Sequence, residues 1–289
     1  MTTRPFRFGV TFFTGVSRAD WQASARRAED LGYDVVLAPD HLGMSSPFAL
    51  LAAAAQVTSR VRLGTFVLNA GFHRPALLAR DVASLDQLLE GRLELGLGAG
   101  YAAHEYEAAG LPFPRAGERV DHLARTVAEL RRLLADEGHQ PTPVQRPTPP
   151  ILVAGQGDRL LRVAARQADI VGIAGALPRD EHDTGHAALA DKIAAVRAAA
   201  GPRWADLELN LLVQAVLPDS EPHPDLSFLR GFAPGLSDER ILALPGVLRG
   251  SPASMADTLR EYRETYGLSY FTVTEPGMDA FAEVIAQLR

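Results

Sequence analysis

The sequence predicts a single α/β domain over residues 1–289 with the fold of a TIM (β/α)8 barrel. Short β-rich runs alternate with amphipathic helical stretches from end to end, which is typical of βα units around a parallel sheet. Eight strands are predicted, and 289 residues accommodate a barrel of ~250 residues with insertions. A doubly wound sheet is the alternative architecture.

Proline and glycine residues separate the predicted strands from the predicted helices. Ser17 and Asp20 form a capping-box-like start to the first helix, and Gly32 ends it. Pro75 suits the first turn of a later helix that Gly91 stops. The eight strands are predicted at 7–13, 34–38, 61–68, 92–98, 151–155, 169–175, 207–216 and 268–275.

Helices fill most of the intervals between these strands. They are predicted from Ser17 to Leu31, from about Pro47, over 75–89, over 116–137, from about Asp158, around 187–200, in two stretches before 268, and at the end of the chain. The segment 138–150 has five prolines and is predicted to be a linker or surface crossover. A domain boundary there would leave four strands in each half, too few to close, so one domain is preferred. Residues 217–236 are predicted to be irregular.

Composition excludes several classes of function. The 35 acidic and 29 basic residues give a formal net charge of −6, which offers nucleic acid no electrostatic attraction. Cysteine is absent, which excludes disulfides, thiolate nucleophiles, iron–sulfur clusters and cysteine–zinc sites. The N-terminus lacks an apolar signal core, and the longest apolar run, 48–55, is far shorter than the ~20 residues of a membrane span. We expect a soluble cytoplasmic protein with a small-molecule partner and no nucleic-acid or membrane partner.

The stretch "LELGLGAGYAAHEYEAAG", residues 93–110, matches the G-x-G-x-x-A form of a dinucleotide-binding loop through Gly98, Gly100 and Ala103. A dinucleotide loop opens straight into a long helix, whereas Gly110, Pro112 and Pro114 interrupt any helix here. The stretch is therefore interpreted as a glycine turn at the C-terminal end of a barrel strand, where its backbone approaches a flat ligand. A tight turn without a ligand is the alternative.

Polar side chains follow three of the predicted strands at the end where barrel active sites lie. These are Asp40 and His41 after the second strand, Asn69, His73 and Arg74 after the third, and Tyr101, His104 and Glu105 after the fourth. A histidine exchanges protons near neutral pH, and a carboxylate accepts hydrogen bonds from a ligand. The alternatives are that Asp40 and His41 anchor a loop, and that His73 and Arg74 are solvated.

A third glycine turn, "AGQGDR" at 154–159, lies between a strand and a helix. Free backbone N–H groups and the positive helix end favour an anion there, so phosphate binding is one interpretation and a tight turn the other. "HDTGH" at 182–186 has the histidine spacing of a zinc helix, but Gly185 interrupts it and no metal is predicted. "GVSRA" at 15–19 lacks the last glycine of a serine-hydrolase elbow.

Taken together, Asp40–His41, "RLGTFVLNAGFHRPALLAR", "GRLELGLGAGY..HEYEAAGLPF" and "GSPASMADTLREYRETYGLSYFTV" resemble the luciferase-like monooxygenase superfamily, and within it the oxidoreductases that use the deazaflavin coenzyme F420. The likeness spans nearly the whole chain. It implies a luciferase-like TIM barrel with insertions, a homodimer, and hydride transfer between the deazaflavin and a small organic substrate. The same scaffold with FMN would be a monooxygenase, and a non-catalytic flavin-binding protein is the alternative of another class.

The resemblance also implies roles for individual residues. His41 would handle the substrate proton, and Tyr101 or His104 would orient the substrate. A non-proline cis peptide would join Phe66 and Val67 behind the cofactor ring. The remaining implied cofactor contacts are Asp40, Asn69, Gly98, Gly100 and His104 at the ring, and Gly155, Gln156, Gly157, Ile173 and Ala174 at the phosphate.

Two departures from the family pattern bear on the substrate. Some sugar-phosphate dehydrogenases of this family have a glutamate acid where this chain has Tyr101, and they bind the substrate phosphate through lysines. Here the only lysine is Lys192. A sugar-phosphate substrate is therefore not expected.

Overall fold

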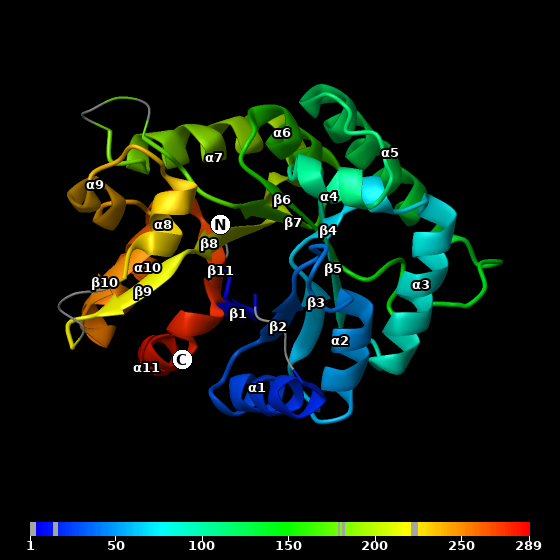
Figure 1. Ribbon diagram of the computed structural model, residues 1–289, viewed down its shortest axis with the longest axis horizontal. Helices are drawn as coiled ribbons and strands as arrows, with labels where there is room; N and C mark the ends of the chain where they lie inside the picture. The colour runs from blue at the N-terminus through cyan, green and yellow to red at the C-terminus, as the bar shows by residue number, and fades with distance from the viewer. Residues whose placement is uncertain (1–3, 14–16, 179, 181–182, 221–224) are drawn as a thin grey trace.

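The computed structural model describes residues 4–13, 17–178, 180, 183–220 and 225–289. In this part of the chain, nine parallel strands form one sheet in the order β3-β2-β1-β11-β8-β7-β6-β5-β4, and a β3–β5 pairing closes it (Figure 1). The strands are β1 (Arg7–Thr11), β2 (Val35–Ala38), β3 (Arg62–Thr65), β4 (Leu68–Asn69), β5 (Leu93–Gly98), β6 (Ile151–Gly155), β7 (Ile170–Ile173), β8 (Glu208–Val213) and β11 (Leu268–Thr274). The predicted TIM barrel is confirmed, with β4 as a short continuation of β3.

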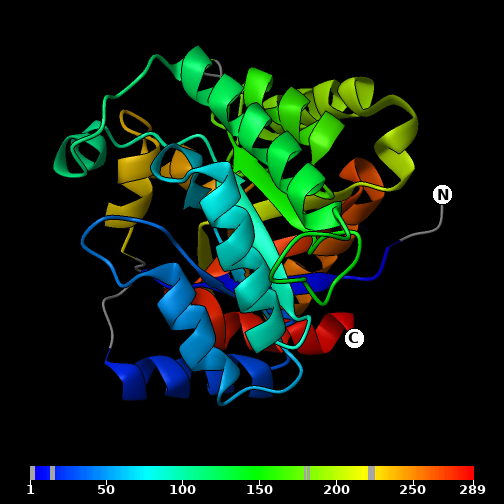
Figure 2. The same cartoon turned by 90° about the vertical axis from the view of Figure 1, so that its right-hand side faces the viewer.

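Helices surround the closed sheet, and the view from the side of α3 and α5 shows both in front of the strands (Figure 2). The helices are α1 (Arg18–Asp30), α2 (Pro47–Ala55), α3 (Pro75–Leu88), α4 (Ala103–Ala108), α5 (Ala116–Ala135), α6 (Asp158–Gln167), α7 (His186–Ala200), α8 (Ser227–Phe232), α9 (Asp238–Leu242), α10 (Pro252–Tyr266) and α11 (Met278–Leu288). The Ser17 hydroxyl accepts a hydrogen bond from the N–H of Asp20, as the capping prediction requires. None of the helices in the described ranges is long and apolar enough to cross a membrane.

Four details correct the sequence-based assignment. The strand predicted at 61–68 is divided into β3 and β4 by a cis peptide bond between Phe66 and Val67. The strand predicted at 207–216 ends at Val213, because the N–H groups of Gln214 and Ala215 both donate to the carbonyl of Gly246. That contact starts a separate two-stranded sheet of β9 (Ala215–Pro218) and β10 (Val247–Gly250). Short helix α8 lies in the segment 217–236, which was predicted to be irregular, and short helix α4 follows the glycine turn, where no helix was predicted.

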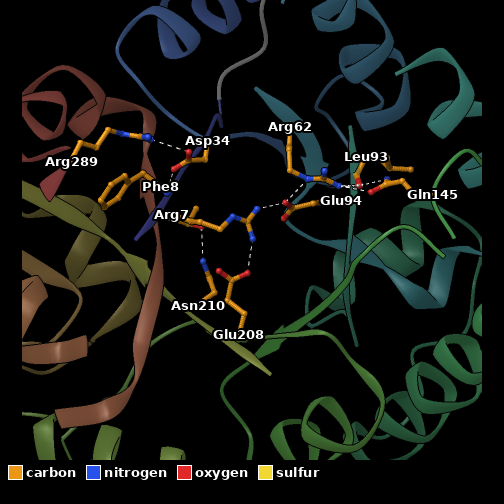
Figure 3. Close-up of polar contacts among 11 residues, drawn as sticks. Arg7, Phe8, Asp34, Arg62, Leu93, Glu94, Gln145, Glu208, Asn210 and Arg289 are labelled. Atoms are coloured by element: carbon orange, nitrogen blue, oxygen red, sulfur yellow. Dashed lines mark hydrogen bonds and ion pairs between the residues drawn. The ribbon is translucent and has the colours of Figure 1, made fainter. Parts of the chain in front are cut away.

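Charged side chains close the N-terminal end of the barrel interior. Arg7 on β1 forms ion pairs with Glu94 on β5 and Glu208 on β8, and Glu94 accepts a second hydrogen bond from Nε of Arg62 at 2.8 Å (Figure 3). Both carboxylates are buried. Burial raises the pKa of Glu208, although Arg7 opposes the rise. Burial also disfavours the charge on Arg7, but the two carboxylates raise its pKa overall.

An apolar layer lies above this charged layer, towards the C-terminal ends of the strands. It consists of Val35, Leu37, Phe66, Leu152, Ala154, Ile170, Leu212 and Tyr270, with Val67 packed against it. The interior is thus filled with side chains and is not a pore, as is usual for this fold. A ligand can therefore enter only above this layer, among the loops that follow the strands.

The Glu29 carboxylate, near the end of α1, fixes the loop that leads into β3. Its Oε2 accepts hydrogen bonds from the N–H groups of Ser59, Arg60 and Val61 at 3.0, 2.6 and 2.8 Å. Desolvation raises the pKa of Glu29, but these three donors lower it by more, so the net shift is downward. The ionised carboxylate therefore stabilises the folded chain.

We expect Glu29→Gln to lower the free energy of unfolding by about 1–3 kcal/mol at pH 7, because an amide accepts these bonds less strongly than a carboxylate. The pKa of Glu29 in the folded state lies below 4.5, the ordinary value for a glutamate side chain. The wild-type advantage is thus complete above that value and disappears as the pH falls through the folded-state pKa. Urea denaturation at pH 7 and at pH 3 measures both effects. Glu283→Gln, at an exposed position on α11, is the control and should change stability by less than about 0.5 kcal/mol.

Candidate active site

The loops that follow β2, β4 and β5 meet at the C-terminal end of the barrel. This follows from the pairings of β2 with β3, β3 with β5, and β4 with β5, which set their carboxyl ends side by side. The predicted residues after the second, third and fourth sequence strands are therefore brought together, as expected from their positions. Their hydrogen bonds separate residues that hold the loops from residues that remain available to a ligand.

Asp40 connects the loop after β2 to the loop after β4. Its Oδ2 accepts a hydrogen bond from the N–H of Asn69 at 3.0 Å and lies 3.5 Å from Nε2 of His73. Both partners belong to the protein, and the Asp40 side chain is only 14% exposed. These contacts support the loop-anchoring interpretation of Asp40, and its contact with a cofactor stays a prediction.

His41 is held by a buried carboxylate that the sequence analysis had only grouped with its neighbours. Nδ1 of His41 lies 2.7 Å from Oε1 of Glu105, whose side chain is 7% exposed, whereas that of His41 is 25% exposed. A carboxylate accepts the Nδ1 proton, so this partner favours the tautomer in which Nε2 is free to exchange a proton with a ligand. The result is a histidine–glutamate pair at the barrel mouth.

Glu105 reaches this position because α4 forms. The helix buries Glu105 and Tyr106 and leaves His104 exposed. The sequence signal for α4 was weak, since it has six residues and ends just before Gly110. The sequence "HEYE" contains two glutamates, Glu105 and Glu107. Which of them contacts His41 depends on which side of α4 is buried.

Tyr101 and His104 differ in how close they come to the histidine. The Tyr101 ring is edge-on to the His41 ring, with centroids 5.8 Å apart, and it is 75% exposed. Desolvation and, second, the Glu105 carboxylate raise the pKa of Tyr101, so the phenol keeps its proton at neutral pH. His104 makes no hydrogen bond, ion pair or ring contact within the described ranges, and its role stays a prediction.

The cis peptide between Phe66 and Val67 lies where the family resemblance implied one. Phe66 is 9% exposed and Val67 is half-buried, and both belong to the apolar layer of the barrel. The neighbouring strand β5 passes very close to this bulge. A Cβ at Gly98 would lie 2.7 Å from Cγ2 of Val67, and one at Gly96 would lie 2.0 Å from the carbonyl oxygen of Thr65. Packing of the bulge alone therefore requires glycine in β5.

Asn69 and Gly100 form the next part of the mouth. Oδ1 of Asn69 accepts hydrogen bonds from the N–H of Gly71 at 3.0 Å and from the hydroxyl of Tyr106 at 2.9 Å. Its amide nitrogen is thereby turned away from these two donors. Gly100 has a φ of +73°, and a Cβ there would lie 2.3 Å from Oδ1 of Asn69. Gly100 thus has both a conformational and a packing reason to be glycine.

A hollow of ≈ 350 Å³ lies beside the third glycine turn, between the start of α6 and α7. Its lining includes Gln156, Gly157, Gly175 and Lys192, and the Lys192 ammonium group donates to the carbonyl of Gln156. The first N–H groups of α6 have no partner within the helix, as at any helix start. A glycine loop, a helix N-terminus and a lysine together suit an anion, although Asp158 and Asp191 also line the hollow and Asp158 lies 4.0 Å from Lys192.

Two residues proposed for the phosphate have backbone contacts within the protein. The N–H of Ala174 donates to the carbonyl of Gly155 at 3.3 Å, and Ile173 is paired with Gly155 in the sheet and is fully buried. The exposed positions Gln156 and Gly157 are better placed for a ligand. The backbone contribution of Ile173 and Ala174 stays a prediction.

The two motifs that the sequence analysis set aside lie partly outside the described residues. His182 is the first histidine of "HDTGH" and is not among them. The second, His186, starts α7 after Gly185, which has a φ of +88°, and its ring lies 5.8 Å from that of Tyr262. In the ranges that the structure describes, histidine and acidic side chains form no group of three suited to a metal ion. The first two residues of "GVSRA" also lie outside these ranges.

Comparison with known proteins defines the class to which this fold and site belong. The family model for luciferase-like monooxygenases matches residues 5–222. The chain therefore belongs to the luciferase-like monooxygenase family. Two solved structures of enzymes, described below, are 18% and 20% identical to the chain, and at this level of identity they indicate only the shared fold.

Among curated relatives, the F420-dependent glucose-6-phosphate dehydrogenase of Intrasporangium calvum is 36% identical over 187 residues, which cover 53% of this chain and 56% of the relative. The enzyme of the same name from Kribbella flavida is 39% identical over 123 residues, covering 39% of this chain and 37% of the relative. The matches thus span about half, or less, of each relative's length.

Two solved structures share the whole fold. An F420-dependent secondary alcohol dehydrogenase in complex with an F420–acetone adduct superposes with a TM-score of 0.81 at 20% identity, covering 99% of this chain and 100% of that one. The F420-dependent tetrahydromethanopterin reductase of Methanopyrus kandleri superposes with a TM-score of 0.79 at 18% identity, covering 99% and 98%. This chain and these two enzymes therefore share the same barrel fold.

Proposed function

We propose that the protein is an oxidoreductase that uses coenzyme F420 and transfers a hydride between the deazaflavin and a small organic substrate. The observation that carries the proposal is the His41–Glu105 pair, whose Nδ1 and Oε1 atoms are 2.7 Å apart at the mouth of the barrel. The curated relatives named above, both F420-dependent enzymes by name, support the choice of cofactor.

The residues at the mouth fit a deazaflavin. A flat ring can rest against Phe66 and Val67, with the amide nitrogen of Asn69 available as a donor. The hollow beside Gly157 and Lys192 suits the phosphate of the cofactor tail. The ring and tail sites lie in neighbouring parts of one rim, since β5 is paired with β6.

When bound, the deazaflavin supplies or accepts the hydride, and the protein handles the proton. In the reduction of a ketone, Nε2 of His41 would donate the proton that the carbonyl oxygen gains. The oxidation of an alcohol follows the reverse course, and His41 accepts the hydroxyl proton. Glu105 fixes the tautomer of His41 and stabilises its protonated form. Tyr101, protonated at neutral pH, can donate a hydrogen bond that orients the substrate oxygen.

We further propose that residues 1–289 act as one domain and that the protein works as a homodimer in the cytoplasm. The dimer is supported by the usual assembly of this family and by two exposed leucines, Leu77 and Leu88, on α3. The single domain is supported by the closed sheet, which takes strands from both sides of the proline-rich segment 138–150. Light scattering of the purified protein measures the assembly.

Gly157 allows a test of the tail site in which the fold is left intact. Gly157 is the N-cap of α6, has a φ of −79°, and has nothing within 4 Å of an added Cβ. Asp and Asn are both favoured at a helix N-cap, so each variant should fold with an unchanged or slightly higher Tm. Gly157→Asp should nevertheless weaken deazaflavin binding about 10- to 100-fold relative to Gly157→Asn, because it adds a negative charge beside the phosphate. Equal affinity of the two variants would contradict the phosphate assignment.

The cofactor itself is tested by titrating the purified protein with oxidised coenzyme F420 and, separately, with FMN, while following ligand fluorescence. We expect micromolar or tighter binding of F420 and much weaker binding of FMN. The opposite preference would indicate an FMN-dependent monooxygenase. Tight binding of either flavin without turnover in any substrate screen would indicate a flavin-binding protein, and binding of neither would overturn the site assignment.

A further inference from the structure

Phe13 lies two residues beyond the end of strand β1, on the side of the barrel mouth. Side chains alternate along a strand, and the even-numbered residues of β1 face outwards. The Phe8 ring packs against Phe281 and the Phe12 ring against Trp21, both of which belong to surrounding helices. The N–H of Phe12 still donates to the carbonyl of Leu37 at 3.4 Å, so the extended course continues past Thr11.

The odd-numbered residues of β1 face the barrel interior. Arg7 contacts Glu94 and Glu208 there, and a Cβ at Gly9 would meet the Tyr270 ring of the apolar layer. Phe13 is the next odd-numbered side chain after Thr11. Alternation therefore directs Phe13 inwards, above the apolar layer and at the level where a ligand enters.

Helix α8 places two more aromatic rings beside Phe13. The Phe228 ring lies 6.2 Å from that of Phe13, and the Phe232 ring lies 4.9 Å from that of Phe228. Phe228 is 46% exposed, although it is one of the largest apolar side chains in this region. An exposed apolar surface at the end of the barrel where a ligand enters is suited to binding an apolar group.

Phe228 is exposed even though α8 packs against a hydrophobic core. The helix has its own small core, which α9 and the β9–β10 sheet complete at the left of Figure 1. This core consists of Leu226, Leu229, Ala233, Ile241, Leu244 and Val247. Leu229, next to Phe228 in the sequence, is 2% exposed. The helix thus buries one side in this core and presents Phe228 on another, towards Phe13.

Two arginines on the helices of this region, Arg230 and Arg240, are already engaged within the described part of the chain. Arg230 of α8 pairs with Asp238, at 2.9 and 3.0 Å from its two carboxylate oxygens. Arg240 of α9 donates to the carbonyls of Asp180 and Asp183. A phosphorylated substrate would have to displace these partners, whereas an uncharged apolar group would not.

We propose that Phe13, Phe228 and Phe232 form the apolar wall of the substrate site, and that the substrate is an uncharged ketone or secondary alcohol with an aliphatic or aromatic substituent. The inference rests on the proposed function, because His41 supplies the proton exchange at the polar end. β1 and β2 are paired neighbours, with Thr11 opposite Leu37, so this wall and His41 follow adjacent strands. The expected substrate differs from the sugar phosphate for which the curated relatives are named.

The probe is a series of alkan-2-ones from butanone to octan-2-one, titrated by ligand-observed NMR into the protein with and without coenzyme F420, and compared with glucose 6-phosphate. We expect the dissociation constant to fall by about two- to fourfold per added methylene, as for burial of apolar surface. Phe228→Ala should remove most of this dependence, and Phe13→Leu should reduce it. Val144→Ala, at a 54% exposed position in the segment 138–150, should leave it unchanged.

Two outcomes would contradict the proposed apolar wall of the substrate site. One is a dissociation constant that does not respond to chain length in the wild-type protein, and the other is an unaltered response in both Phe228→Ala and Phe13→Leu. Glucose 6-phosphate that binds more tightly than octan-2-one would also contradict the proposed substrate class. A chain-length response in a protein that does not bind F420 would support the wall and reject the proposed function, so the two failures are distinct.

Discussion

Replacing His41 by alanine is expected to lower kcat by about 10²- to 10⁴-fold, because the imidazole is the group that exchanges the substrate proton. The dissociation constant of F420 should change by less than about threefold, since the phosphate hollow and the side chains of Phe66 and Val67 remain. The measurement is the steady-state rate at which reduced F420 is oxidised in the presence of the alkan-2-one that the wild-type protein reduces fastest. Full activity in His41→Ala would contradict the proposed mechanism.

Glu105→Gln separates the positioning of His41 from the proton exchange itself. The amide keeps the size of the side chain but removes the charge that favours one tautomer and stabilises protonated His41. We expect a smaller loss of kcat than in His41→Ala, and a changed dependence of kcat on pH. A matched variant at the neighbouring exposed carboxylate, Glu107→Gln, should retain the wild-type pH profile.

Replacing Arg7 by methionine is expected to lower the free energy of unfolding by about 3–5 kcal/mol, because it leaves Glu94 and Glu208 buried without their shared cation. In this variant Glu94 still pairs with Arg62, whereas the buried Glu208 loses the cation that offsets its desolvation. Burial already raises the pKa of Glu208 when Arg7 is present. Equilibrium denaturation in urea at pH 7 measures the loss. The circular dichroism spectrum shows whether the variant folds at that pH.

Two further variants identify the cause of this destabilisation. Adding Glu208→Gln to Arg7→Met should recover part of the lost stability, since it removes one of the unpaired charges. Arg260→Met, which breaks the exposed pair with Asp257, should cost less than about 1 kcal/mol. A loss of that small size in Arg7→Met would mean that the charged layer does not determine stability.

Much of the barrel could be predicted from the sequence because its strands and helices are marked locally. Glycine and proline stops, together with the Ser17 cap, define elements without reference to distant parts of the chain. The β9–β10 sheet could not be predicted in this way. It depends on the Gly246 carbonyl, which lies far along the chain and accepts hydrogen bonds from Gln214 and Ala215. The four-residue β10 has too little pattern to be recognised alone.

The same distinction applies to the candidate site. The rim residues could be predicted because every parallel strand ends at the same face of a barrel. The His41–Glu105 pair could not, because it requires α4 to bury one of the glutamates of "HEYE". Gly98 at the end of β5 and Gly100 just after it were interpreted as making room for a ligand, yet close contacts of Gly98 with Val67 and of Gly100 with Asn69 already require glycine at both positions. Sequence alone does not separate these two reasons for a glycine.

A crystal structure of the protein in complex with coenzyme F420 tests the central claim most directly. We predict that the deazaflavin ring lies against the side chains of Phe66 and Val67, that the phosphate of the coenzyme occupies the hollow beside Gly157 and Lys192, and that Nε2 of His41 faces the space above the ring. A ring bound away from Phe66 and Val67, or a phosphate outside that hollow, would contradict the account.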